Sequence, residues 1–299
     1  MSVLVVGSVA LDTIKTPFGR KKDILGGSAT FSSVSASLFC PVNLVAVVGK
    51  DFPKKYIKFF NSKGVNTQGL TIEEGKTFRW EGEYGWDFAD PKTISTDLNV
   101  FASFNPKLPI QYRKAKHIFL ANIDPRIQEK VLRQIAKPRL VACDTMNYWI
   151  EKKKRQLIKL LKKVDVFLVN ESEAKEFTTE ANLITAGKNL LKFGPKVIII
   201  KKGEHGVFLF SHNHIFAIPA FLLETVYDPT GAGDTFAGGF MGYLTKCKKY
   251  TKNHLRNAVV YASVMATFAV EDFSLKKLSK VTIADLNKRI KEFRKYTTF

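Results

Sequence analysis

The sequence is poor in cysteine and has no long hydrophobic run, and both shortages exclude classes of protein. Its 299 residues include 3 Cys, 11 Pro and 19 Gly, and these ordinary Pro and Gly levels are those of a folded globular chain rather than a fibrous or disordered one. Cys40, Cys143 and Cys247 lie far apart with no histidine at metal-ligand spacing, so neither a disulfide framework nor a zinc site is expected. No apolar run approaches the roughly 20 residues of a transmembrane helix.

The opening stretch MSVLVVGSVALD has no basic segment before its apolar run. It therefore predicts a first buried strand rather than a signal peptide. Together with the scarce cysteines, this leads us to expect a cytoplasmic protein with no membrane partner.

Acidic residues are also few, since 27 Asp and Glu stand against 47 Lys and Arg, for a formal charge of +20. Such a balance fits a nucleic-acid partner, an anionic substrate or a generally basic proteome. In EKKKRQLIKLLKK (151–163) the apolar residues form one stripe, so the lysines are most simply the solvated face of a helix. KCKKYTKNHLR (246–256) is typical of a helix end followed by a turn. Neither run has the interleaved aromatics of a single-strand binding platform.

Short runs of Val, Ile and Leu alternate with amphipathic stretches along the chain. The runs lie at residues 3–7, 44–49, 117–121, 139–144, 165–170 and 197–201. They predict strands buried on both faces, and hence βα units with a mostly parallel sheet. A helix is expected after Asp51 as N-cap, closed by Gly64, and another over 125–137.

One region departs from this pattern. Over residues 70–104 the stretch TFRWEGEY alternates, and turn signals occur at Gly75 and Asp90-Pro91. This favours antiparallel strands apart from the main sheet, joined by residues 12–24. The region is either a β-lid inserted over an active site or a simple extension of the sheet. With no linker or repeat, residues 1–299 are expected to form one domain with this insertion.

The stretch DPTGAGDTFAGGF (228–240) carries the chemistry. A helix beginning near Gly231 to Asp234 would point several backbone N–H groups, and the positive end of its dipole, at an anion. Gly231 and Gly233 would let a phosphate approach, and the Asp234 carboxylate beside it is placed to accept a proton. The alternative is a glycine-rich helix start chosen for close packing. No Gly-Lys-Ser/Thr follows, so the motif is not a Walker A loop.

This stretch, together with LGGSATFSSVSASLF (25–39) and VAVVGKDF (45–52), resembles the ribokinase-like (PfkB) carbohydrate and nucleoside kinase family over nearly the whole chain. The resemblance implies an α/β, three-layer ribokinase-like fold, with a mostly parallel central sheet flanked by helices plus a small β-lid. It also implies an ATP-dependent kinase that transfers the γ-phosphate to a hydroxymethyl group of a sugar or nucleoside.

The resemblance assigns roles to residues on the phosphate side. Asp234 is the expected general base, and the N–H groups of Gly231, Ala232 and Gly233 with that of Asp234 are the expected anion hole. The nucleotide-binding residues are expected to be Asn170, Glu173, Lys201, Gly203 and Ser263. Glu173 would also place Mg²⁺ through water, and Asp228 and Thr230 match a K⁺ site of some relatives.

On the acceptor side, an aspartate at position 12 and a Gly-Gly pair match the family. The substrate-binding residues are expected to be Asp12, Gly26, Gly27, Arg79, Asn99 and Asn122. The chain departs from sugar-specific relatives because SATFSS follows the glycines where many of them carry Asn. With Trp80 available to stack on a ring, this leans towards a nucleoside. Asp144 and Asn147 follow a strand and either approach the cleft or act as local caps.

Two alternatives stay open at this point. Within the family, the acceptor is a simple sugar or an adenosine-like nucleoside. Outside it, the +20 charge suggests a nucleic-acid-binding protein on a kinase scaffold. Because Gly231, Gly233 and Asp234 are intact, we expect an enzyme with a small-molecule substrate and no nucleic-acid partner. We expect a monomer or a homodimer.

Overall fold

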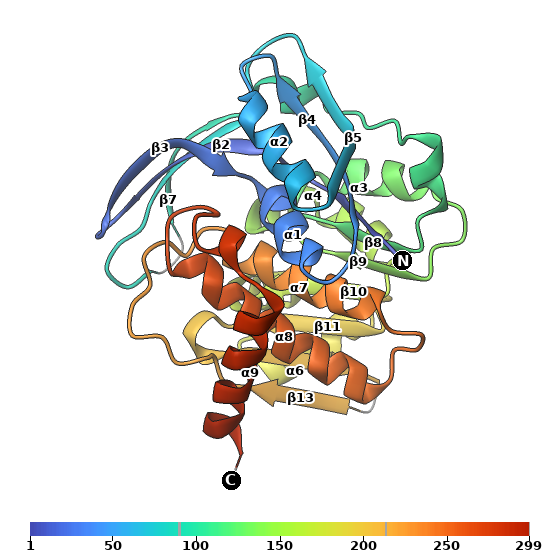
Figure 1. Cartoon of the computed structure of the whole chain (residues 1–299). Helices are drawn as coiled ribbons and strands as arrows, with labels where there is room; N and C mark the ends of the chain where they lie inside the picture. The colour runs from blue at the N-terminus through green and yellow to red at the C-terminus, as the bar shows by residue number, and fades with distance from the viewer. Residues whose placement is uncertain (89–90, 213, 299) are drawn as a thin grey trace.

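A nine-stranded sheet runs through the middle of the protein in the computed structural model, which describes residues 1–88, 91–212 and 214–298 (Figure 1). The strand order is β13-β12-β11-β10-β9-β8-β1-β4-β5. The strands are β1 (Val3–Val6), β4 (Val42–Gly49), β5 (Val65–Glu73), β8 (His117–Leu120), β9 (Leu140–Cys143), β10 (Val166–Asn170), β11 (Val197–Lys201), β12 (Val207–Ser211) and β13 (His214–Ile218). All pair in parallel except β12 and β13, which extend one edge antiparallel. Each predicted apolar run forms a strand, within two residues at either end.

Helices cover both faces of this sheet, which makes the predicted three layers. One face carries α1 (Ser28–Ser37), α2 (Lys54–Ser62), α7 (Ala232–Thr245), α8 (Lys252–Val270), η4 (Leu278–Lys280) and α9 (Ile283–Thr297). The other carries η1 (Asn99–Ser103), η2 (Ile110–Lys114), α3 (Pro125–Leu132), α4 (Asn147–Leu161), α5 (Glu171–Thr178) and α6 (Leu183–Leu191). A short turn of 3-10 helix, η3 (Gly203–His205), joins β11 to β12. Alternate residues of β1 enter the two apolar layers, as expected for a strand buried on both faces.

A separate four-stranded sheet lies to one side (Figure 1), in the order β3-β2-β6-β7. It consists of β2 (Ala10–Thr16), β3 (Gly19–Gly26), β6 (Arg79–Glu83) and β7 (Lys92–Asp97), and we call it the side sheet. Residues 70–73 of the predicted insertion belong instead to β5 of the main sheet. Asp90 of the predicted turn lies outside the described residues.

The predicted antiparallel pairing of the side sheet is wrong for one pair. β2 pairs with β3, and β6 with β7, antiparallel, whereas β2 and β6 run parallel. The reason is that β2 and β6 both leave the main sheet at the same edge, after β1 and β5 respectively, and therefore start in the same direction.

Two helix predictions need correction. Asp51 does not cap α2, which begins at Lys54 after Pro53; its carboxylate instead accepts hydrogen bonds from Thr77. Gly64 does close the helix, with a φ of +73° that an L side chain rarely adopts. The helix predicted over 125–137 ends earlier, at Leu132. Among the described residues, no helix combines the length and apolarity needed to cross a membrane.

Helix α7 lies unusually close to its neighbours, because glycines face them. A Cβ at Gly238 would collide with the carbonyl oxygen of Ser32 on α1, and one at Gly239 would come within 3.2 Å of α8. The Ser35 hydroxyl of α1 donates to the carbonyl oxygen of Thr235 at 2.6 Å. Close packing therefore explains the later glycines of the 228–240 stretch, and it fixes where α7 begins.

The buried side chain of Gln128, on α3, ties two neighbouring strands together just beyond their carboxyl ends. Its Nε2 donates to the backbone oxygens of Leu120, Ala121 and Asp144 at 2.9 to 3.1 Å, and the residue is fully buried. This contact holds the segments after β8 and β9 in place.

We predict that Gln128→Leu lowers the free energy of unfolding by about 2 kcal/mol, because three backbone oxygens each lose a buried hydrogen bond, although the Leu120 oxygen keeps the one from the Asp144 N–H. Chemical denaturation would measure the change. The matched control is Gln111→Leu at an exposed position, which should shift the free energy by less than about 0.5 kcal/mol. Equal effects of the two substitutions would contradict the role given to Gln128.

Candidate active site

Polar side chains gather where neighbouring parallel strands end. Asn122 follows β8, Asp144 follows β9, Asn170 ends β10 and Lys201 ends β11. Ligands of open α/β sheets bind outside this carboxyl edge. The start of α7 meets the same edge, since a Cβ at Gly233 would lie 3.0 Å from Lys201 Nζ.

The start of α7 leaves backbone donors without acceptors. In the part of the chain that the structure describes, the N–H groups of Gly231, Gly233 and Asp234 have no hydrogen-bond partner, whereas that of Ala232 donates to the Pro229 oxygen at 3.2 Å. Orphan donors at a helix N-terminus, with the dipole behind them, suit an anion. Gly231 has a φ of +75°, and a Cβ there would collide with the Phe31 ring. The sequence predicts that the missing side chain of Gly231 leaves space for a phosphate. In the structure the Phe31 ring fills that space.

The Asp234 carboxylate, in the first turn of α7, is only partly exposed. Burial, reinforced by the negative charge of Asp144, raises its pKa from 3.8 to about 7, while Lys201 acts in the opposite direction. A carboxylate with a pKa near neutrality is well matched to accepting and returning a proton.

Lys201 forms an ion pair with Asp144, at 2.9 Å between Nζ and Oδ2. The two side chains are 16 % and 4 % exposed. Burial alone would lower the lysine pKa, but the charges of Asp144, Glu173 and Asp234 outweigh it, and the pKa is raised. Lys201 is therefore an ammonium ion within an otherwise acidic group of side chains.

Asn170 and Glu173 form a reciprocal cap at the start of α5. The Asn170 side chain accepts from the Glu173 N–H, and Glu173 Oε2 accepts from the Asn170 N–H, both at 2.7 Å. The predicted N-x-x-E element is thus a capping box, which its spacing alone would have indicated. In the described residues no group of three or more His, Cys, Asp or Glu could hold a metal ion. Magnesium commonly binds through phosphates and water with one or two carboxylates, and the role of Glu173 towards it stays a prediction.

Two further residues predicted on the nucleotide side show features that fit a ligand. The Ser263 hydroxyl, on α8, is buried and has no hydrogen-bond partner among the described residues. Gly203 follows β11 with a φ of +55°, and no heavy atom lies within 4 Å of the position of a Cβ. An orphaned hydroxyl and an open turn are both compatible with a bound nucleotide.

On the acceptor side, Asp12 lies against the Gly-Gly pair. A Cβ at Gly26 would collide with the Asp12 carboxylate, and Gly27, with a φ of +94°, begins α1. Burial raises the pKa of Asp12 to about 8; the Gly27 N–H opposes this shift, and the charges of Asp228 and Asp234 add to it. Asp234 therefore lies close enough to Asp12 to influence the ionisation of Asp12.

Asn122 is held by a residue that the sequence analysis missed. Its Oδ1 accepts from Trp149 Nε1 at 2.9 Å, which leaves its amide N–H groups for another acceptor. Trp149 is half-buried, near the start of α4. Asn147 instead donates to Glu176 at 2.7 Å, so it makes a local contact between α4 and α5.

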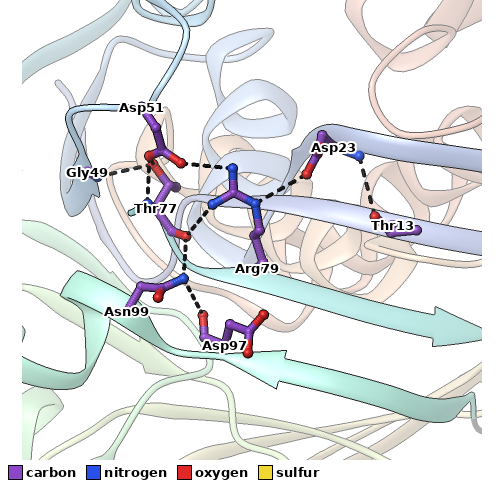
Figure 2. Close-up of polar contacts among 8 residues, drawn as sticks. All are labelled: Thr13, Asp23, Gly49, Asp51, Thr77, Arg79, Asp97 and Asn99. Carbon is purple, nitrogen blue, oxygen red and sulfur yellow. Dashed lines mark hydrogen bonds and ion pairs between the residues drawn. The ribbon is translucent and has the colours of Figure 1, made fainter. Parts of the chain in front are cut away.

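Arg79 and Asn99 have partners within the protein, as Figure 2 shows. Arg79 donates to Asp51, Asp23 and the Thr77 oxygen at 2.8, 3.2 and 3.2 Å. Asn99 donates to the same Thr77 oxygen at 3.0 Å. The structure thus places both in a network that ties the side sheet to the loop after β4, and this geometry gives no support to their predicted contact with substrate.

Asp228, predicted to bind K⁺, is fully buried. Its oxygens accept from the N–H groups of Thr230 and Ser274 at 2.9 and 3.2 Å. Burial raises its pKa in spite of these hydrogen bonds. Thr230 in turn donates through its hydroxyl to Tyr84 of the segment after β6, at 3.2 Å.

A carboxylate of raised pKa beside orphan backbone amides, at the carboxyl edge of a three-layer α/β fold, is an arrangement that suits phosphoryl transfer to an alcohol. The model of the pfkB family carbohydrate kinases matches residues 3–280. The chain therefore belongs to this family, whose members are ATP-dependent carbohydrate and nucleoside kinases that use Mg²⁺.

Individual relatives agree with this assignment. The chain is similar to a cytidine kinase of Thermococcus kodakarensis, with 31 % identity over 249 residues, or 81 % of this chain and 88 % of that one. In fold it is similar to the nucleoside kinase of Methanocaldococcus jannaschii, with a TM-score of 0.77 and 21 % identity over 97 % of this chain and 98 % of that one. An E. coli structure of the same fold, with ATP and Mg²⁺, gives a TM-score of 0.79 at 16 % identity, covering 97 % and 99 %.

We predict that Asp12→Asn stabilises the protein as pH rises. Asp12 has a pKa of about 8 in the folded state against an ordinary 3.8, so the native state loses stability from about pH 4 upwards, and the loss is complete above pH 8. The Asp12→Asn variant has no carboxyl group at this position, so its stability does not fall in this way as pH rises. Its Tm should exceed that of the wild type by a small margin at pH 4 and by the full margin above pH 8.

Thermal unfolding between pH 4 and pH 9 would test this expectation. The control is Asp97→Asn at an exposed position of β7. A Tm difference for Asp12→Asn that does not change with pH would show that the buried carboxyl is not the cause.

Proposed function

We propose that the protein is a nucleoside kinase in which Asp234 is the general base. The observation that carries the proposal is the position of the Asp234 carboxylate, with a pKa of about 7, beside the unpartnered N–H groups of Gly233 and Asp234 itself. A proton acceptor and unpaired donors for a phosphoryl group thus belong to the same helix turn, which supports a role in transfer to an alcohol.

The chain's own residues would perform most of the reaction by positioning and electrostatics. Asp234 takes the proton of the acceptor hydroxyl as the oxygen forms its bond to phosphorus and the bond to the leaving ADP oxygen breaks. The N–H groups at the start of α7 stabilise the negative charge on the phosphoryl oxygens. ATP supplies the phosphoryl group, and Mg²⁺ neutralises charge on its oxygens.

Three observations support a nucleoside as the acceptor. The relatives include proteins named cytidine kinase and nucleoside kinase. Asp12 presents a carboxyl group beside the Gly26-Gly27 pair, suited to ribose hydroxyls. Trp149 is half-buried and its indole N–H binds Asn122, one of the predicted substrate residues, so its ring would be the surface on which a base stacks; Lys153 Nζ lies 5.2 Å from the ring centroid. A simple sugar would use the Asp12 carboxyl group but not the indole.

We further propose that residues 1–299 form one kinase domain in which the side sheet serves as a lid. The tip of this sheet reaches the loop before α7, where the rings of Phe18 and Tyr227 are 4.9 Å apart. Tyr84 contacts Thr230, and Phe273 packs on Ile14 beneath the sheet. Such a cover would exclude water, which competes with the alcohol for the phosphoryl group.

We propose a K⁺ ion near Asp228 on electrostatic grounds. Its buried carboxylate has no lysine, arginine or histidine within ion-pair distance in the described residues. A monovalent cation would supply the missing charge beside the segment that leads into α7.

We predict that Asp234→Asn lowers kcat by at least ~10²-fold, the usual contribution of a positioned base, while ATP binding stays nearly unchanged. The wild type should also lose kcat/KM as pH falls below about 7, because the protonated carboxyl cannot accept a proton. ADP release in a coupled assay measures the rate, and calorimetry the affinity. Ordinary turnover by the variant would contradict the assignment of the base.

The same assay, with ATP and Mg²⁺, tests the acceptor when it is run with cytidine, adenosine, inosine, ribose, fructose and ketodeoxygluconate. Running each with and without K⁺ tests the proposed monovalent cation. We predict that a nucleoside gives the highest kcat/KM, because only a nucleoside uses the indole. A higher kcat/KM for ribose or fructose would contradict the proposal of a nucleoside acceptor and would identify a sugar as the acceptor.

A further inference from the structure

Lys201 stands out because the proton transfer to Asp234 does not need it. Its Nζ lies at the start of α7, 3.0 Å from the position that a Cβ on Gly233 would occupy. The N–H groups of Gly233 and Asp234 in the same turn have no acceptor in the described part of the chain. An ammonium ion and two orphan amides therefore converge on one small region.

The ion pair with Asp144 fixes the lysine there. Asp144 is 4 % exposed, and its Oδ1 accepts from the Thr145 N–H at 2.8 Å, while Oδ2 accepts from Lys201. This is the one hydrogen bond of the Lys201 ammonium among the described residues, and an ammonium has three N–H donors. Lys201 thus has donors left to offer a ligand without leaving Asp144.

A purely structural ion pair is the competing explanation. Buried pairs often contribute little net stability, because removing two charges from water costs as much as their attraction returns. A buried ion pair that adds little stability is explained if its lysine also has a function in the reaction. At this position that function would be to complement negative charge on a phosphoryl group.

We propose that Lys201 is a catalytic residue that contacts the transferring phosphoryl group, and that Asp144 is the positioning residue that holds its ammonium in place. The inference rests on the proposed kinase function and deepens it. As the acceptor oxygen bonds to phosphorus and the bond to the ADP oxygen breaks, the proton goes to Asp234. Lys201 keeps its own proton and neutralises charge on the phosphoryl oxygens.

Binding measurements distinguish this role from general nucleotide binding. The probes are ADP with Mg²⁺ alone, and ADP with Mg²⁺, aluminium fluoride and cytidine, where the fluoride mimics the transferring group. Lys201→Met should weaken the fluoride complex by at least ~10²-fold, the scale for losing one such donor, and ADP by only a few-fold. Lys201→Arg should restore part of the difference.

The matched control is Lys196→Met. Lys196 directly precedes β11 and pairs with Asp165 at 2.7 Å, so this substitution removes the same charge from the opposite end of the same strand. It should change neither affinity. Equal weakening of both complexes by Lys201→Met, or weakening of neither, would overturn the proposal. Normal turnover of Lys201→Met alongside an inactive Asp234→Asn would overturn it while leaving the kinase function intact.

The pH profile of kcat/KM tests the positioning role independently. The charged groups that act on the Asp234 carboxyl group are Asp144 after β9 and Lys201 at the end of β11. Asp12 on β2 is also near, because the Asp234 charge contributes to its raised pKa. Removing the Lys201 charge should move the acid limb to higher pH, and Asp144→Asn should move it to lower pH while also reducing kcat. The proposal would be refuted if the acid limb moved in the same direction in both variants. It would also be refuted if the acid limb did not move in variants whose Tm equals that of the wild type, because the ion pair would then have only a structural role.

Discussion

The close contact between α1 and α7 is the constraint on which the site depends. Gly238 lets α7 approach the backbone of α1, the Ser35 hydroxyl binds the Thr235 oxygen, and Gly231 makes room for the Phe31 ring. These contacts fix the point at which α7 begins. Because the orphan N–H groups and the Asp234 carboxylate belong to that first turn, a shift of the helix by one residue would separate them from Lys201 and Asp144.

The site is rich in acidic side chains, whereas the chain as a whole is basic. In a chain of formal charge +20, the carboxyl groups of Asp144, Glu173 and Asp234 act on the Lys201 ammonium ion. The Asp12 carboxyl group lies near Asp234. Their crowding and burial raise the pKa values of Asp12 and Asp234, while the helix start and Lys201 supply the positive potential an anion needs. The surrounding excess of lysine and arginine would draw anionic substrates towards this edge.

Much of this arrangement could be predicted from the sequence, because the signals are local. Buried apolar runs predicted the strands, and one stretch of thirteen residues predicted the start of α7 and the carboxylate in it. The failures concern partners that are distant in the chain. The sequence predicts Asp51 to be a helix cap, but its partners are Thr77 and Arg79. Lys201 and Asp144 are brought together only by the order of the strands, and nothing in the sequence pairs Trp149 with Asn122.

The most direct test of the account is a titration of the Asp234 carboxyl carbon by ¹³C NMR in the protein without ligands, with Asp234→Asn used to assign the signal. The account predicts a midpoint near pH 7, as expected for a partly buried base that shares its surroundings with Asp144 and Lys201. A midpoint near 4, the value of an ordinary solvated aspartate, would contradict the electrostatic environment on which the proposed catalysis rests.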